Sequence, residues 1–341
     1  MDIKVKGSRL KNLFSYDWAK ILISIIAGVV VWSLLFTTLG TRSTVGEEFY
    51  FTLYDNVKSV SATKNGTLLE KLKKDKVLSY DVLSLNATSI TSAGEYSASY
   101  MLSLRTTTFE GDVILMSDGR GEYVEEGKEN TTAKNMQSAI NAHYFYNIET
   151  FLSDAKSYCL GNGFINVDGE DYATYTVNRE KIERYFLNQR IPSARNYKKT
   201  YRTEEQKAEG VKNEIERIEN VYKNWLFVSS AIQNAKDLGN DFIWYGEIKK
   251  YDDKGNEIEG EGEILPLGID LYKLNINFKD KAKIEDSWYT YTNNPDEKGK
   301  ATTEEGLVMC VFNFKSEQRD LQYESLAFLR YIIQSYSGYG E

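Results

Sequence analysis

An uncharged apolar run near the start of the chain constrains its architecture more than any other feature. Residues 21–39 read ILISIIAGVVVWSLLFTTL and contain no Asp, Glu, Lys or Arg. At about 1.5 Å of rise per residue, a helix of this length spans the hydrocarbon core of a bilayer, which is about 30 Å thick. The pattern predicts a transmembrane helix over residues 19–40.

The charges on the two sides of the run differ in sign. Lys and Arg outnumber Asp and Glu before it, whereas Arg42 is soon followed by Glu47 and Glu48. Because positively charged flanks favour the cytoplasmic side, we expect a cytoplasmic basic tail over residues 1–18 and an extracytoplasmic α/β domain over residues 41–341. The protein is then a single-pass protein of the cell membrane with a cytoplasmic N-terminus.

A cleavable signal peptide is the competing interpretation of the same run. Its apolar core would be only about 7 to 15 residues long, and a small-residue cleavage site would follow it. The run is longer than this, and residues 37–42 (TTLGTR) offer no convincing pair of small residues. We therefore expect the run to be retained as an anchor.

The charge and cysteine content of the chain narrow the class of partner. The chain has 341 residues and a net charge of −8 at pH 7, and its excess of acidic residues lies beyond the apolar run. An acidic surface disfavours nucleic acid and anionic membrane surfaces as partners. Cys159 and Cys310 lie too far apart in sequence to indicate a disulfide framework, and they could form one bridge or remain two buried thiols.

Strand and helix patterns alternate after the apolar run. We expect strands over residues 48–54 and 77–85 with a short helix over residues 68–74 between them, and a longer helix that begins near Ser92. Residues 113–116 (VILM) are apolar at every position, which is typical of a strand buried on both faces. The order strand, helix, strand, helix, strand predicts a parallel α/β lobe.

The second half of the chain predicts a long helix, a hairpin and a closing strand and helix. Thr203 and Gln206 have capping-box spacing, and apolar residues follow at intervals of four and three. This helix packs on its own domain or forms a coiled coil with a partner, and the few flanking charge pairs favour its own domain. Residues 242–265 predict a β-hairpin, residues 306–314 a strand and residues 317–336 a helix.

Motifs for catalytic chemistry are scarce. His143 is the only histidine, which excludes a histidine-rich zinc site and the HExxH class of metalloprotease. Ser61-x-x-Lys64 and Ser153-x-x-Lys156 match the S-x-x-K of penicillin-binding proteins, but no S-x-N or K-T-G element follows at the required place. We therefore expect no enzymatic activity, no catalytic or metal-binding residue and no cofactor.

Residues 100–118 (YMLSLRTTTFEGDVILMSD) resemble a unit of the extracellular solute-binding proteins of bacterial ABC importers. In that family a helix leads into a Gly-Asp-Val/Ile segment that begins a buried strand. A second similarity lies near the end, where residues 307–314 lead by a polar loop into residues 326–332 (LAFLRYI). The resemblance implies a two-lobed, periplasmic-binding-protein-like α/β body that serves an ABC-type importer. Its members are usually free or lipid-anchored and richer in proline and glycine at the hinge, and the chain departs from both patterns.

A ligand site is expected at the carboxyl ends of the parallel strands. The loop after the buried central strand offers Asp118 and Arg120, and the rings of Trp244, Tyr245 and Trp288 are candidates for an opposite wall, with core packing as their alternative role. We therefore expect non-catalytic binding of a small polar solute, a sugar or peptide-like molecule, and a membrane permease as partner. The alternative function is a structural or protein-interaction component of the cell envelope.

Overall fold

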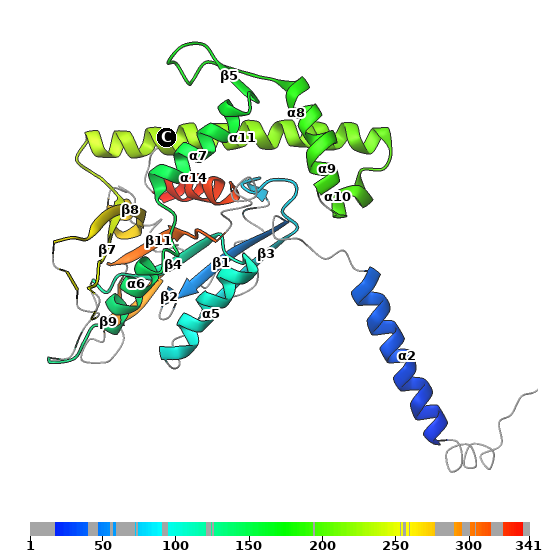
Figure 1. The fold of residues 1–341 in the computed structure, drawn as a ribbon, viewed down its shortest axis with the longest axis horizontal. Coiled ribbons are helices and arrows are strands. Elements are labelled where there is room, and N and C mark those ends of the chain that lie inside the picture. Colours follow the sequence, from blue (N-terminus) through cyan, green and yellow to red (C-terminus); the bar gives the residue numbers. More distant parts are fainter. Residues whose placement is uncertain are drawn as a thin grey trace, which may run out of the picture. The chain divides into compact units, whose positions relative to one another are not determined.

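Strand β4 lies at the centre of a six-stranded mixed sheet in the computed structural model of the chain (Figure 1). Across the sheet the strands are β3 (Ser84–Ile90), β1 (Glu48–Tyr54), β4 (Val113–Ser117), β11 (Leu307–Val311), β8 (Glu263–Asp270) and β7 (Ile243–Ile248). The first three are parallel, and each of the remaining strands runs antiparallel to the neighbour before it. The prediction of an α/β body is confirmed, with a mixed rather than a purely parallel sheet.

The structure describes residues 18–39, 47–54, 57–58, 72, 74–90, 95–120, 124, 126–193, 195–252, 254, 257–258, 260–276, 290–294, 301–303, 305–314 and 323–336. The chain divides into two units, Met1–Ser43 and Thr44–Glu341. The second unit is built around the one large sheet. The predicted two-lobed, periplasmic-binding-protein-like body is therefore wrong, because β11, β8 and β7 of the second half pair into the sheet of the first half through the β4 and β11 ladder.

Helix α2 (Trp18–Leu39) lies in the first unit. Within the described ranges, no helix has both the length and the apolar character needed to cross a membrane, so the predicted transmembrane helix is wrong. The expected orientation, with a cytoplasmic N-terminus, depended on that helix and is not tested by the fold.

The side chains of β4 alternate between two cores. Val113 and Leu115 face one cluster of buried apolar residues, Ile114 and Met116 face the other, and all four are 0% exposed. Because successive residues of a strand point to opposite faces, a strand between two cores must be apolar at every position. The prediction of a strand buried on both faces is confirmed.

Helices cover both faces of the sheet (Figure 1). These helices are α5 (Glu95–Thr108) and α6 (Thr131–Asn141) on one face, and α7 (Ile148–Gly161) and α14 (Glu324–Tyr336) on the other. Phe328 of α14 packs against the sheet, with its ring centroid 5.4 Å from that of Phe49 and 5.7 Å from that of Phe51. Helix α11 (Glu204–Asp237) packs over α14 and α7.

Helix α11 begins where the sequence predicts. The Thr203 hydroxyl accepts a hydrogen bond from the Gln206 N–H at 3.2 Å, and Gln206 Oε1 accepts one from the Thr203 N–H at 3.0 Å. Ile218, Tyr222 and Trp225 are buried in the core shared with the sheet. The preference for packing on its own domain over a coiled coil is therefore confirmed.

One predicted strand has different bounds. The pattern placed a strand over residues 77–85, but β3 begins at Ser84 and residues 77–83 form a loop. The side chains of Ser79, Tyr80 and Asp81 in this loop bond to α14, α11 and the segment before α11, so these contacts take the place of a strand ladder. The β-hairpin predicted over residues 242–265 corresponds to the antiparallel pair β7 and β8.

Shorter elements complete the second unit. They are β2 (Val57–Lys58), β9 (Thr290–Asn294) and β10 (Ala301–Thr303) in a small sheet, β5 (Ile165–Val167) and β6 (Tyr175–Val177) in a hairpin, and the helices α8 (Arg179–Tyr185), α9 (Ile191–Ser193), α10 (Arg195–Thr200) and α12 (Leu271–Ile276). A π-helical turn (η2), Phe186–Arg190, joins α8 to α9, and Pro192 follows it. Proline cannot donate a backbone hydrogen bond, which favours a widened turn at this point.

The two cysteines lie in different cores and are free thiols. Cys159 belongs to the cluster under α7 and α11, whereas Cys310 belongs to the cluster on the opposite face of the sheet. Burial raises the pKa of the Cys159 thiol to about 12. Of the two alternatives left by the sequence, the structure contains the buried thiols.

Candidate functional site

Three of the residues predicted to bind a ligand meet at the carboxyl end of β4. Asp118 Oδ2 accepts hydrogen bonds from Arg120 Nε at 2.7 Å and from Trp244 Nε1 at 2.9 Å. Arg120 Nη2 also donates to Asp270 Oδ2 at 2.6 Å. Gly119 has φ of +85°, a left-handed conformation that glycine adopts readily and that turns the loop back so that Arg120 reaches both carboxylates.

The polar groups of this cluster bond mainly to one another. The side chain of Asp118 is 9% exposed and that of Asp270 is 1% exposed, while that of Arg120 is 44% exposed. The neighbouring carboxylates Asp270 and Asp118 more than offset the effect of burial, so the pKa of Arg120 lies above its ordinary value. Two carboxylates already balance the charge of Arg120, so it attracts an anionic ligand only weakly, and we interpret this cluster as a structural link between β4, β8 and β7.

The other two predicted residues do not join the cluster. The Tyr245 hydroxyl donates to Asp241 Oδ2 at 3.2 Å, and its side chain lies on an exposed part of β7. Trp288 lies outside the described residues. The structure therefore brings Asp118, Arg120 and Trp244 together, whereas the sequence had placed Trp244 on the wall opposite the other two, and ligand binding by these residues stays a prediction.

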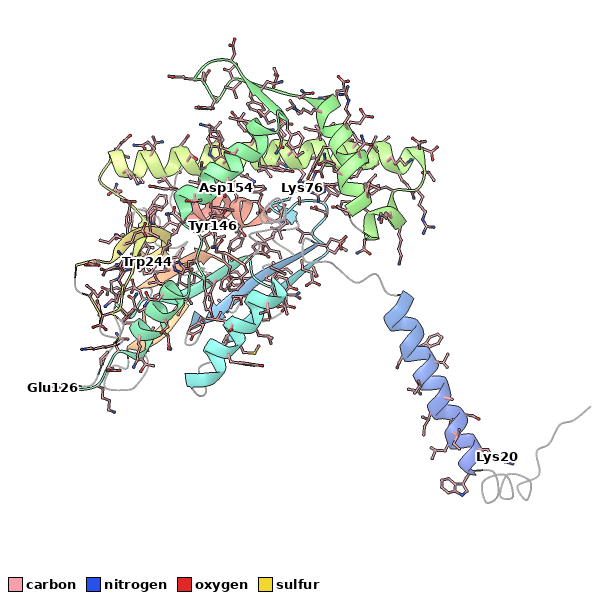
Figure 2. All side chains as sticks on the ribbon, viewed as in Figure 1. Lys20, Lys76, Glu126, Tyr146, Asp154 and Trp244 are labelled. Atoms are coloured by element: carbon pink, nitrogen blue, oxygen red, sulfur yellow. The ribbon has the colours of Figure 1, made fainter. Side chains whose placement is uncertain are left out.

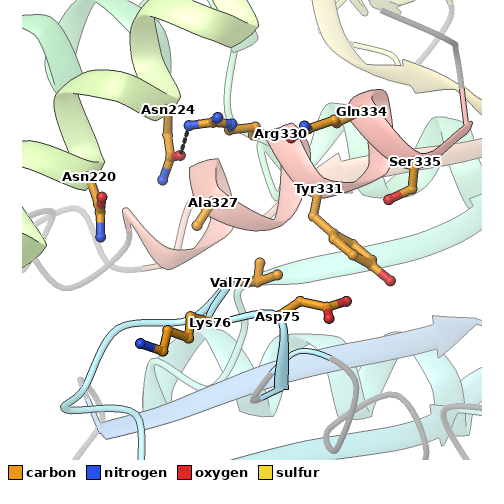
Figure 3. Close-up of a pocket in the computed structure, with 10 residues that line it drawn as sticks. All are labelled: Asp75, Lys76, Val77, Asn220, Asn224, Ala327, Arg330, Tyr331, Gln334 and Ser335. Atoms are coloured by element: carbon orange, nitrogen blue, oxygen red, sulfur yellow. Dashed lines mark hydrogen bonds between the residues drawn. The ribbon is translucent and has the colours of Figure 1, made fainter. Parts of the chain in front are cut away.

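A groove with a different lining lies between the turn at residues 75–77, helix α11 and helix α14 (Figure 3). Its volume is about 460 Å³. Its lining residues are Asp75, Lys76, Val77, Asn220, Asn224, Ala327, Arg330, Tyr331, Gln334 and Ser335. We call it the α11–α14 groove. It lies in a different part of the second unit from the Asp118 cluster, as the positions of Lys76 and Trp244 in Figure 2 show.

Helical spacing explains how the polar groups of the groove converge. Asn220 and Asn224 are four residues apart on α11, and Arg330 and Gln334 are four apart on α14, so each pair shares one face of its helix. Arg330 Nη1 donates to Asn224 Oδ1 at 3.1 Å and joins the two helices across the groove (Figure 3). Lys76, with φ of +51°, forms the turn that closes the third side.

A second hollow adjoins the α11–α14 groove. It has a volume of about 360 Å³ and shares Lys76 and Asn220 with the groove. Its further lining comes from the loop before β3, including Ser79 and Tyr80, and from α11, including Arg217. The two hollows therefore form one polar surface along α11.

A network of buried charges lies beneath this surface. Arg190 Nη2 lies 2.5 Å from Asp81 Oδ2, and Arg217 Nη2 lies 2.8 Å from Glu214 Oε1. Arg190 Nη1 also approaches Glu214 Oε1 at 3.4 Å, and all four side chains are at most 6% exposed. Tyr80 donates its hydroxyl hydrogen to Glu214 Oε2 at 2.9 Å, so the loop before β3 is bonded to α11.

The charges of this network stabilise one another. Burial alone would raise the pKa of Asp81, but the guanidinium groups of Arg190 and Arg217 hold it below its ordinary value. Burial and the nearby Arg217 oppose the charge on Arg190, yet Glu214 and Asp81 keep the pKa of Arg190 well above its ordinary value. Buried charges persist only when paired in this way, and the network therefore fixes the relative positions of the segments beside the groove.

Sequence reasoning missed the groove because its parts come from three distant segments. One pattern could have indicated the network below it: Glu214 and Arg217 occur three residues apart on the otherwise apolar side of α11. A charged pair at buried helical positions requires further partners. The sequence alone does not show that these partners are Asp81 and Arg190.

In the part of the chain that the structure describes, no group of three or more His, Cys, Asp or Glu side chains is arranged to hold a metal ion. The polar groups that line the groove are side-chain amides, hydroxyls and a few charged groups. Comparisons with protein-family models, curated proteins and solved structures found no significant match. The resemblance to solute-binding proteins of ABC importers therefore stays a prediction.

Proposed function

We propose that the protein binds a small polar solute in the α11–α14 groove and performs no chemistry on it. The observation that carries this proposal is the groove itself, about 460 Å³ in volume and lined by polar side chains from three segments. Ligand pockets usually have volumes of about 300 to 1,000 Å³ and a few convergent polar groups. A solute of the size of a mono- or disaccharide or a short peptide fits this range.

The lining favours sugars or peptide-like molecules within that class. The side-chain amides of Asn220, Asn224 and Gln334 each offer donors and an acceptor. Sugar hydroxyls and peptide groups both donate and accept hydrogen bonds, so they pair well with amides. Asn220 and Gln334 are exposed, and Asn224 lies deeper at 9% exposure, which places polar contacts at the rim and at the base.

The buried charge network supports binding by holding the groove in shape. It bonds the loop at residues 79–81 to α11 through Tyr80 and Glu214. The same loop is bonded to α14 through Ser79 and Glu324. A preformed site costs less conformational entropy on binding than one that must be ordered by the ligand. In the proposed role, the bound solute passes to the permease of an ABC-type importer, as the resemblance of residues 100–118 implies.

Isothermal titration of the purified full-length chain against a panel of oligosaccharides and short peptides tests this proposal. We expect at least one class to bind, and we expect the double variant Asn220→Ala/Gln334→Ala to weaken its binding. Gln233→Ala is the matched control, because Gln233 is also an exposed amide on α11 but bonds to Asp237 and does not line the groove. Absence of binding by every panel member would favour the alternative, a structural or protein-interaction component of the cell envelope.

A further inference from the structure

Arg330 differs from the arginines of the two polar clusters. Arg120, Arg190 and Arg217 each pair with at least one Asp or Glu. Arg330 forms no ion pair with any described carboxylate, and the only hydrogen bond of its side chain within the described residues is the one to the Asn224 side chain at 3.1 Å. It is nevertheless partly buried in the wall of the α11–α14 groove.

The geometry around Arg330 leaves hydrogen-bond donors available. Its guanidinium has five N–H donors in a planar fork, and Asn224 accepts from Nη1. The guanidinium carbon lies 5.0 Å from the centroid of the Phe227 ring, a cation–π contact that leaves the N–H donors unused. Asn224 accepts through its oxygen, so its amide hydrogens remain as further donors beside the fork.

The charge around Arg330 is also uncompensated. Burial lowers the pKa of Arg330 below its ordinary value, and among the described residues no carboxylate forms an ion pair with Arg330 that opposes this effect. The charged residues that line the groove are Asp75, Lys76 and Arg330, which leaves an excess of one positive charge in a protein whose net charge is −8. An anionic group in the groove would offset the desolvation of the guanidinium.

We propose that the solute of the α11–α14 groove carries a carboxylate, and that Arg330 binds this carboxylate through two parallel N–H donors with the Asn224 amide beside them. This inference rests on the proposed function and names the chemical class of its solute. Arginine suits the role because its fork matches the two oxygens of a carboxylate, and charge-assisted bonds of this kind are roughly twice as strong as neutral ones. Acidic sugars and peptides with a free C-terminus satisfy this requirement.

Matched probes that differ only at the acidic group test the inference on the full-length protein. The pairs are glucuronate with glucose, and N-acetyl-dialanine with its C-terminal amide. By isothermal titration we expect the acid of at least one pair to bind about tenfold or more tightly than its neutral partner, and its affinity to fall as salt rises. We expect Arg330→Gln to abolish this discrimination and Arg330→Lys to retain part of it.

The outcomes separate the inference from the proposed function. Equal binding of acid and neutral probes would overturn the carboxylate inference and leave solute binding in place. If Arg330→Gln lowered the affinity for the acid and for its neutral partner equally, the inference would also be overturned, because the residue would then have only a structural role. Failure of every probe in both pairs and of every member of the wider panel would overturn both proposals.

Discussion

Glu324 holds Ser79 through both of its carboxyl oxygens. The Ser79 N–H donates to Oε2 at 2.9 Å, and Ser79 Oγ lies 2.5 Å from Oε1. The same hydroxyl also contacts Asp81. A hydroxyl has only one hydrogen to donate, so two carboxyl groups compete for one donor here. Burial and the neighbouring Asp81 raise the pKa of Glu324 to about 7, whereas Arg190 and Arg217 hold the pKa of Asp81 below its ordinary value, so Glu324 is the carboxyl group that binds a proton more readily.

The raised pKa of Glu324 makes the free energy of unfolding depend on pH. In the unfolded chain Glu324 loses its proton near its ordinary pKa of 4.5, whereas the folded protein keeps it up to about pH 7. The folded state therefore binds more protons in this window, and its stability falls as pH rises through it, by about 1.4 kcal/mol for each pH unit at most. In the Glu324→Gln variant the side chain is neutral at every pH, so this fall in stability with rising pH is absent.

Urea denaturation of both proteins at pH 5 and pH 8 measures the effect. We expect the free energy of unfolding of the wild type to drop relative to that of Glu324→Gln by about 2 to 3 kcal/mol between the two pH values. The comparison with the variant removes contributions from other titrating groups. A difference between the two proteins that is the same at both pH values would show that Glu324 is ionised throughout.

Removing one carboxylate from the buried network is expected to be costly. Glu214 is 0% exposed and pairs with Arg190 and Arg217. Glu214→Gln leaves two buried guanidinium groups with Asp81 as their remaining close carboxylate, so we expect a loss of about 3 to 5 kcal/mol in the free energy of unfolding. Glu216→Gln is the control on an exposed position of the same helix, with an expected change within about 0.5 kcal/mol. Equal stability of the two variants would contradict the described network.

Gly210 is expected to resist a substitution that normally stabilises helices. Replacing glycine by alanine in a helix usually gains up to about 1 kcal/mol. At Gly210 a Cβ would lie 2.5 Å from Phe186 Cζ, so we expect Gly210→Ala to lower stability by about 1 to 3 kcal/mol. Gly161→Ala in α7 is the control, because nothing lies within 4 Å of its Cβ position. In thermal unfolding we expect the midpoint temperature of Gly161→Ala to be equal to or higher than that of the wild type, and that of Gly210→Ala to be lower than that of the wild type.

The centre of the sheet is expected to exclude charge. Ile114 is 0% exposed in β4, so Ile114→Asp would bury an unpaired carboxyl and should cost about 4 kcal/mol or more, or prevent folding. Ile264→Asp places the same change on β8, where the wild-type side chain is 69% exposed, and should be tolerated. Circular dichroism and urea titration compare the two, and a stably folded Ile114→Asp variant would refute the central position of β4.

The elements that the sequence predicted correctly are those with local signals. Thr203 and Gln206 lie three residues apart and fix the start of α11 within one turn. The apolar run of β4 needs only its own residues to indicate burial on both faces. The loop at Asp118 and Arg120 was placed correctly because it directly follows that strand.

Features that the sequence did not predict depend on residues far apart in the chain. The antiparallel pairing of β11 with β4 joins the two halves into one sheet, and no local pattern distinguishes it from a strand in a second lobe. The α11–α14 groove requires the turn at Lys76 to lie beside Arg330. The bond between Ser79 and Glu324 spans 245 positions, so spacing cannot reveal it.

Hydrogen–deuterium exchange of the full-length protein, with and without the tightest-binding member of the solute panel, tests solute binding in the α11–α14 groove most directly. The account predicts slower amide exchange in residues 74–83 and 324–336, and in the part of α11 around Asn220 and Asn224, because the ligand holds these three segments together. Protection confined to the loop at residues 118–120 and to β7, with no change beside the groove, would place the site at the Asp118 cluster and contradict the account.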